Sequence, residues 1–188
     1  ADQLGQVLIA LLRFAQQNQV IHGAHAVGGA AVVHIFAHID FAADDRVNAA
    51  LSMTYTLLAH DCASALESVG LDAYVGFMHT DRPGRRSLAL DLVEEFRAIM
   101  CDRFVISLIN KRIINNGDFE KREDGAVLLS EDGRKVFLTH WQNRKQDVVM
   151  HPFLKEKVEW GLLPYIQALL LSRYIRGDLD EYPMLLWR

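Results

Sequence analysis

Apolar residues recur every three or four positions along most of the chain, which is the spacing of one face of an α-helix. The clearest stretch runs from Val47 to Val69, and Gly70 follows it directly. Its apolar positions are Val47, Leu51, Tyr55, Leu58, Cys62, Leu66 and Val69. Because glycine is common where a helix ends in a left-handed residue, the pattern predicts a long amphipathic helix that ends at Gly70.

Weaker helical patterns fill most of the remaining sequence. They predict helices near residues 4–15 and 24–39, from Ser87 with or without a break to about Ile114, from Asp132 to Asp147, and from either His151 or Pro164 to Gly177. Residues 71–86 are rich in turn formers and predict a connection. Residues 119–130 combine a Glu-Asp-Gly turn with the run Val-Leu-Leu, which predicts a small β-hairpin. The expected fold is therefore all-α, with several helices and at most one small hairpin.

Composition supports a globular domain without a membrane span. The chain has 188 residues, of which 51% are hydrophobic and 23% charged, and this suits one domain with a substantial core. The longest stretch without a charged residue, Phe14 to Ile39, contains several Gln and His residues, and no signal peptide is visible. Cys62 and Cys101 lie within helical patterns without metal-type spacing, so we expect reduced core thiols in a cytoplasmic protein.

Positive charge is concentrated in the second part of the chain. The net charge is −4, yet of the 20 Lys and Arg residues only Arg13 and Arg46 precede residue 81. The other 18 bases face 17 acids in the last 108 residues. Contact with nucleic-acid phosphates, if the protein makes any, is therefore expected in that second part.

Candidate metal ligands gather where the predicted connection meets the helix that begins near Ser87. His79 ends an apolar strip, and Asp91 is followed by Glu94 and Glu95 at offsets of three and four residues. These offsets place carboxylates on one side of a helix, and a set with one nitrogen suits Mn²⁺ or Mg²⁺ better than Zn²⁺. Carboxylates are also favoured in an ordinary solvated first turn, so the spacing alone leaves both interpretations open.

Four motifs resemble those of one family. The chain reads Val47-Asn-Ala-Ala-Leu-Ser, then Gly70-Leu-Asp-Ala-Tyr-Val-Gly-Phe-Met-His79, then Asp81-Arg-Pro-Gly-Arg-Arg-Ser-Leu-Ala-Leu-Asp91-Leu-Val-Glu-Glu-Phe-Arg97, and later Trp141-Gln-Asn-Arg-Lys. These motifs resemble the CRISPR-associated integrases of spacer acquisition, most closely the type I branch, over residues 45–188. The resemblance implies the helical C-terminal catalytic domain of such an integrase. Residues 1–44 would supply its N-terminal helices and residues 45–188 its helical core, while the family's N-terminal β-sandwich is absent.

The resemblance also implies an activity and a site. The family is a metal-dependent DNA endonuclease and integrase that uses Mg²⁺ or Mn²⁺ to join prespacer 3′-hydroxyl ends to the CRISPR repeat by transesterification. A Glu, a His and an Asp hold the metal there; His79 and Asp91 match two of these positions. Glu94, or else Glu95, matches an additional acid, but the family Glu aligns with Gly28, and no acid occurs between Asp2 and Asp40.

Partners and DNA contacts follow from the same resemblance. Arg82, Arg85 and Arg86 are expected to hold DNA phosphates, with Arg97 as a more distant candidate; ordinary surface charge is the alternative for all four. The expected partners are double-stranded prespacer and repeat DNA, a second copy in a homodimer, a small ferredoxin-like CRISPR adaptation protein and a prespacer-trimming nuclease, all in the prokaryotic cytoplasm. Two other functions remain open: a catalytically inactive DNA-binding scaffold, suggested by Gly28, and a general metal-dependent DNA nuclease.

Overall fold

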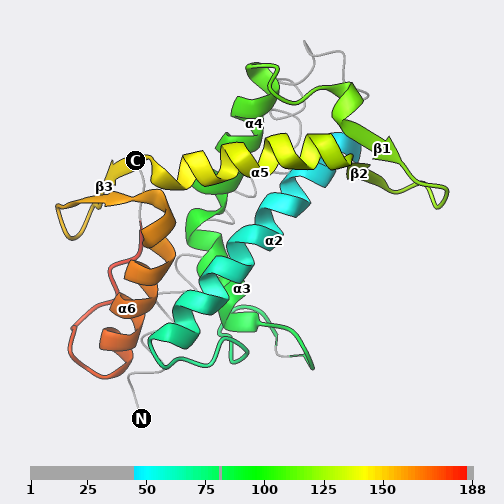
Figure 1. The fold of residues 1–188 in the computed structure, drawn as a ribbon. Coiled ribbons are helices and arrows are strands. Elements are labelled where there is room, and N and C mark those ends of the chain that lie inside the picture. The colour runs from blue at the N-terminus through cyan, green and yellow to red at the C-terminus, as the bar shows by residue number, and fades with distance from the viewer. Residues whose placement is uncertain (1–44, 81, 186–188) are drawn as a thin grey trace, which may run out of the picture.

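The computed structural model describes residues 45–80 and 82–185, and most of them lie in helices. The α-helices are α2 (Asp45–Ser68), α3 (Ser87–Phe96), α4 (Arg103–Asn110), α5 (Glu131–Gln146) and α6 (Leu163–Ile175), as Figure 1 shows. This confirms the all-α prediction. The expected helices before residue 45 and the alignment of Gly28 lie outside the described residues. Among the described helices, none combines the length and apolar character that a bilayer span requires.

Helix α2 runs through the middle of the fold and packs against α3, α6 and strand β2 (Val127–Leu129) (Figure 1). Its apolar face is fully buried at Leu58, Cys62 and Leu66. The helix ends as its sequence predicts, because Gly70 takes a left-handed φ of 80° that few other residues adopt. The backbone N–H of Leu71 then donates to the carbonyl of Leu66 at 3.0 Å, which closes the last turn.

Helices α3 and α4 form one long helical stretch that is interrupted by a π-helical turn, η1 (Arg97–Asp102). The apolar pattern predicted a helix with or without a break, and this turn is the break. The helical stretch ends at Asn110, about one turn before the predicted end near Ile114. Side chains from α2 and η1 meet at the turn: the hydroxyl of Tyr55 donates to Asp102 at 2.6 Å, and the guanidinium of Arg97 lies 5.0 Å from the centre of the Tyr55 ring.

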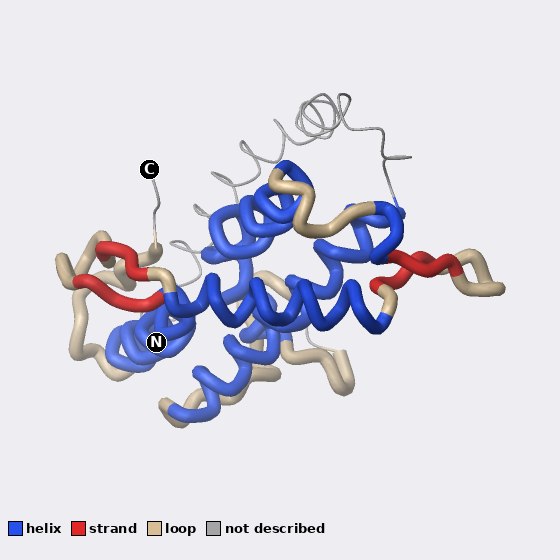
Figure 2. The backbone as a smooth tube through the Cα atoms, turned by 45° about the horizontal axis from the view of Figure 1, so that its top comes forward, coloured by secondary structure: helices blue, strands red, loops and turns tan. Residues whose placement is uncertain are grey.

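Two antiparallel hairpins lie at opposite ends of α5, as Figure 2 shows. The first pairs β1 (Phe119–Lys121) with β2 and confirms the predicted hairpin. The second pairs β3 (Val148–Met150) with β4 (Lys157–Glu159), so the expectation of at most one hairpin was wrong. Its strands are as short as those of the first hairpin, but the residues between them, 151–156, contain no glycine to signal a turn. The 3₁₀ turn η3 (Trp160–Leu162) follows, so the last helix begins at Leu163, beside Pro164 and not at His151.

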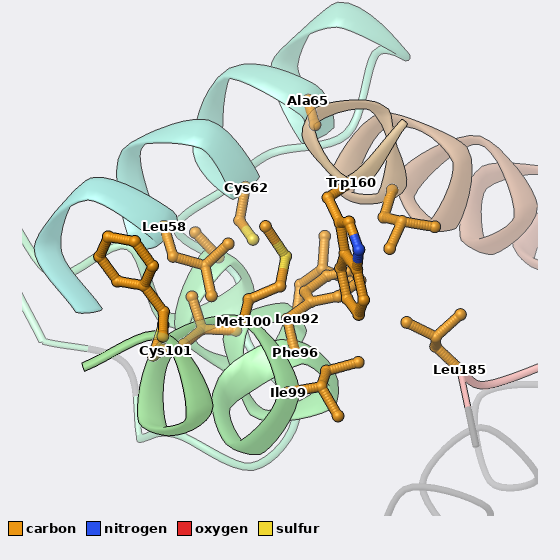
Figure 3. Close-up of a cluster of buried hydrophobic side chains, with 14 of the residues drawn as sticks. Leu58, Cys62, Ala65, Leu92, Phe96, Ile99, Met100, Cys101, Trp160 and Leu185 are labelled. Atoms are coloured by element: carbon orange, nitrogen blue, oxygen red, sulfur yellow. The ribbon is translucent and has the colours of Figure 1, made fainter. Parts of the chain in front are cut away.

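The core is a continuous cluster of apolar side chains from all the helices. Figure 3 shows part of it, where Leu58 and Cys62 of α2 face Leu92, Phe96 and Met100. Helix α5 joins this core through the aromatic rings of Phe137 and Trp141. The ring of Phe104 lies edge-on to Phe137 and Trp141, with centroids 5.4 and 5.2 Å away.

The two cysteines behave as ordinary core residues. Cys62 and Cys101 are both free thiols with no exposed surface. Burial raises the pKa of both thiols, since a thiolate is poorly solvated in the core. The structure thus confirms that they are buried, unpaired thiols in the fold.

A buried polar network ties α3 to α6, to the second hairpin and to the C-terminal segment. Glu95 accepts hydrogen bonds from the hydroxyl of Tyr182 at 2.6 Å, the side-chain amide of Gln167 at 2.7 Å and the backbone N–H of Leu185 at 3.0 Å. The other end of the Gln167 amide, its Oε1, lies 3.2 Å from Nε2 of His151. Burial raises the pKa of Glu95 although these donors favour the charged carboxylate.

The network fixes the tautomer of His151. Its Nδ1 accepts the backbone N–H groups of Phe153 and Leu154 at 3.3 and 3.2 Å, so the ring proton is on Nε2 and is donated to Gln167. A second ring proton would displace two amide donors. Burial lowers the pKa of His151, and the imidazole is therefore held neutral in the folded protein.

We expect His151 to make stability depend on pH. Its pKa is lower in the folded than in the unfolded chain, so the unfolded state binds the proton first and the free energy of unfolding falls as pH drops below about 6.5. Between pH 7 and pH 5, His151→Gln should lose less stability than the wild type, by up to about 2 kcal/mol. Urea denaturation at both pH values measures this. Equal losses in the two proteins would contradict the assignment.

Candidate functional site

The loop before α3 is attached to that helix at two points. The carbonyl of Ala73 accepts the backbone N–H groups of Leu88 and Ala89 at 3.0 and 3.3 Å, and so satisfies donors that a helix N-terminus leaves free. Further along the loop, Phe77, Met78 and His79 donate their backbone N–H groups to the carboxylate of Asp91. The distances are 2.6, 3.0 and 2.9 Å. The conformation of the loop is thus set largely by one buried side chain, Asp91, which is 4% exposed.

Asp91 also holds the imidazole of His79. Nδ1 of His79 lies 2.6 Å from the Oδ1 atom that accepts the backbone N–H of the same residue. A carboxylate can only accept, so Nδ1 carries the proton and the lone pair of the neutral ring lies on Nε2. The His79 side chain is 25% exposed, whereas that of Asp91 is 3% exposed. This is the arrangement in which a carboxylate orients a histidine whose other nitrogen binds a metal.

Gly76 lets the loop approach the helix closely. A Cβ atom at this position would meet Cβ of Ser87 at 2.5 Å and Oδ2 of Asp91 at 3.0 Å. No side chain fits that space without moving the loop away from α3. In the Gly-Phe-Met-His sequence, Gly76 therefore permits the close contact between loop and helix, and His79 supplies the imidazole.

The two glutamates after Asp91 have opposite surroundings. Glu95 is buried and belongs to the core network with Tyr182 and Gln167. Glu94 is half-buried on the outer side of α3, three residues from Asp91, and its Oε1 lies 3.4 Å from a guanidinium nitrogen of Arg97. Of the two acids offered by the sequence, Glu94 is therefore the one whose carboxylate lies outside the core network.

The four arginines expected at DNA have different surroundings. The side chains of Arg82 and Arg85 make no polar contact with any other described residue. Arg86 lies 3.4 Å from the hydroxyl of Tyr74 and 3.3 Å from Nδ1 of His60. Arg97 is engaged with Glu94 and with the ring of Tyr55.

Sequence reasoning missed the aromatic residues around these arginines. Tyr55 was assigned to the apolar face of α2, and His60 and Tyr74 were given no role. Their positions on a helix and in a loop 14 residues later carry no local pattern that brings them together. Residues 74–86 contain a single tyrosine, Tyr74, and the arginines follow it by eight residues or more, so no signal of these contacts was available in the sequence.

The described residues offer donor types for a divalent cation but no complete set of three. Within residues 45–80 and 82–185, no group of three or more His, Cys, Asp or Glu side chains is arranged to hold a metal ion. His79 offers an imidazole nitrogen and Glu94 offers a carboxylate, and both are donor types that suit Mg²⁺ or Mn²⁺. The position that the resemblance assigns to a further ligand, Gly28, is outside the described residues.

Comparison of the sequence with known proteins identifies relatives. The family model described as CRISPR associated protein Cas1 matches residues 41–143. CRISPR-associated endonuclease Cas1 2 of Rhodospirillum rubrum is 56% identical over 77% of this chain and 42% of its own length. A CRISPR-associated exonuclease Cas4/endonuclease Cas1 fusion of Geobacter sulfurreducens is 41% identical over 74% of this chain and 25% of its own length. The chain thus spans well under half the length of these relatives.

Two solved structures have a fold similar to that of this chain. A casposase bound to integration product has a TM-score of 0.68 and 29% identity, over 76% of this chain and 41% of the casposase chain. A chain of a partial Cas6-RT-Cas1–Cas2 complex has a TM-score of 0.61 and 27% identity, over 75% of this chain and 41% of its own. Both similarities cover about three quarters of the sequence.

We expect Asp91 to be far more important for stability than His79. Asp91→Ala leaves three backbone N–H groups of the loop without their acceptor and should lower the free energy of unfolding by about 3 kcal/mol. His79→Ala leaves those three hydrogen bonds intact and should cost less than about 1 kcal/mol. Urea denaturation of both variants at neutral pH measures the difference. Equal destabilisation would show that the carboxylate does not organise the loop.

Proposed function

This chain belongs to the family of CRISPR associated protein Cas1, and from that premise we propose that it carries a metal-dependent DNA-joining site. In the proposed reaction, the 3′-hydroxyl of a prespacer attacks a phosphodiester of the CRISPR repeat. The observation that carries the proposal is the hydrogen bond between His79 and Asp91. It places the proton on Nδ1 and leaves the lone pair of Nε2 available to bind a metal ion. The similarity to a casposase bound to integration product supports joining as the reaction.

The chain's own residues have distinct roles in this proposal. Nε2 of His79 and the carboxylate of Glu94 would hold the metal ion, and Asp91 would orient the imidazole. The sequence-based prediction made Asp91 itself a ligand. Its two oxygens already accept four hydrogen bonds, and this supports a role behind the imidazole.

A bound Mg²⁺ or Mn²⁺ would stabilise negative charge on the reacting phosphate and its oxygens. The guanidinium groups of Arg82 and Arg85, which make no polar contact within the described part of the chain, would hold phosphates of the DNA beside the loop. One phosphodiester bond forms as another breaks, and the repeat strand is released with a new 3′-hydroxyl. The number of phosphodiester bonds is unchanged, so the reaction needs no additional source of energy.

We also propose the partners that this function requires. The DNA substrates are a double-stranded prespacer and the CRISPR repeat, and two copies of the chain would form a homodimer. A relative exists as a fusion of Cas4 exonuclease with Cas1 endonuclease, which supports association with a prespacer-trimming nuclease. A similar structure is a Cas1–Cas2 complex, which supports a small ferredoxin-like adaptation protein as a further partner.

A second function is favoured by a specific observation. The described residues contain no complete group of three ligands, and the family Glu aligns with Gly28. These facts suit a DNA-binding scaffold that assembles with partners but joins no DNA. Hydrolysis of DNA by a general nuclease would give cut products without joined ones, so analysis of the products separates all three functions.

Replacement of His79 tests the proposal directly. With Mn²⁺ and DNA bearing a free 3′-hydroxyl, we expect His79→Ala to lower the rate of joining to a repeat-containing plasmid by about 100-fold or more, since a metal ligand is lost. His140→Ala, which removes a half-buried histidine on α5, is the matched control and should keep the wild-type rate.

Labelled donor DNA recovered in the plasmid measures joining, and fluorescence anisotropy measures binding. Full joining by His79→Ala would refute the proposed site. DNA binding by the wild type without any joined product would support the scaffold.

A further inference from the structure

The C-terminal segment after α6 returns to α3 and bonds to the helix that carries the candidate site. The hydroxyl of Tyr182 donates to Oε1 of Glu95 at 2.6 Å, and the backbone N–H of Leu185 donates to Oε2 at 3.0 Å. We propose that Tyr182 is a positioning residue for the metal-dependent reaction, because it holds α3, through Glu95, in the orientation that Glu94 needs as a ligand. The inference rests on the proposed function and adds to it a determinant that lies 87 residues from Glu95 along the chain.

Glu95 lies in the same helical turn as the two acids of the candidate site. It follows Glu94 directly and is four residues beyond Asp91, so all three lie within about 6 Å along the axis of α3. A helix is stiff over one turn because its backbone hydrogen bonds connect each residue to the fourth one before it. A rotation of α3 that moves Glu95 would therefore move Glu94 and Asp91 as well.

The orientation of the Glu95 carboxylate is set from the C-terminal part of the chain. Its hydrogen-bond donors among the described residues are Tyr182, Leu185 and the side-chain amide of Gln167, and none of them belongs to α3 or to the loop before it. Glu95 is 8% exposed, so water does not readily replace a lost donor. Loss of one of these bonds would remove a restraint on the rotation of α3.

The hydroxyl of Tyr182 has one favoured direction. It accepts the Gln167 amide at 3.0 Å and donates to Glu95, which fixes the position of its proton. Burial raises the pKa of Tyr182, so the hydroxyl stays protonated and able to donate. The rest of the segment is held by packing, since Leu185 belongs to the same apolar cluster as Trp160 (Figure 3). Removal of the hydroxyl alone should thus leave the segment in place.

Titration of the full chain with Mn²⁺, without DNA, separates positioning from a merely structural role. The electron paramagnetic resonance signal of free Mn²⁺ gives both the dissociation constant and the number of sites. We expect Tyr182→Phe to raise the dissociation constant by at least about fivefold with the number of sites unchanged, since loss of a group behind a metal ligand commonly weakens binding by about tenfold or more. A merely structural role would lower the number of sites, because fewer molecules would be folded.

Tyr174→Phe is the matched control. Tyr174 lies on α6 and is also buried, with its ring centroid 6.4 Å from that of Tyr182, but it is not a donor to Glu95. This variant should keep the wild-type dissociation constant. The inference is overturned if Tyr182→Phe binds Mn²⁺ as tightly as the wild type, if it lowers only the number of sites, or if both variants weaken binding equally.

The joining assay scores the proposed function separately. A wild type without a Mn²⁺ site that His79→Ala removes would overturn both the inference and the metal-dependent function. Tyr182-dependent Mn²⁺ binding without joined DNA would leave the inference standing while the function fails. Joining by the wild type, with no effect of Tyr182→Phe on the Mn²⁺ titration, would reject the inference alone.

Discussion

The site depends on one buried carboxylate that gathers four N–H groups. Asp91 is anchored on α3, and three successive backbone amides and an imidazole converge on its two oxygens. Hydrogen bonds to an ionised acceptor are among the stronger ones in proteins, and here they replace the secondary structure that the loop lacks. The reactive nitrogen of His79 is consequently held by the helix and not by the loop that carries it.

Helix α3 separates two kinds of acid within one turn. Asp91 binds the loop, and Glu94 lies on the outer side of the helix. Glu95 faces inward and accepts hydrogen bonds from Tyr182, Gln167 and the C-terminal segment. The inner carboxylate fixes the rotation of α3, because turning the helix would break three buried hydrogen bonds. A rigid helix of this kind can hold Glu94 in one direction relative to His79, as a metal site requires.

Much of this architecture is predictable from sequence because it rests on local patterns. The apolar spacing of α2 and its terminal Gly70, the start of α3 at Ser87 and the first hairpin all agree with the structure. The meeting of His79 with Asp91 followed from the resemblance and is also borne out as a contact. The role of Glu95 was not predictable, since it depends on Tyr182 and Gln167, which lie far along the chain. The second hairpin was not predictable either, since the Val-Val-Met sequence of β3 shows no alternation of apolar and polar residues and no glycine marks the turn.

Crystals of the full chain soaked in Mn²⁺ offer the most direct test of the central claim, that Asp91 presents Nε2 of His79 to a divalent cation. Anomalous scattering should place Mn²⁺ at coordination distance from Nε2 and from the carboxylate of Glu94, while Asp91 keeps its hydrogen bonds to Nδ1 and to the three loop amides. An ion bound elsewhere, with Nε2 free, or an Asp91 side chain that has left the loop amides to bind the ion, would contradict the account.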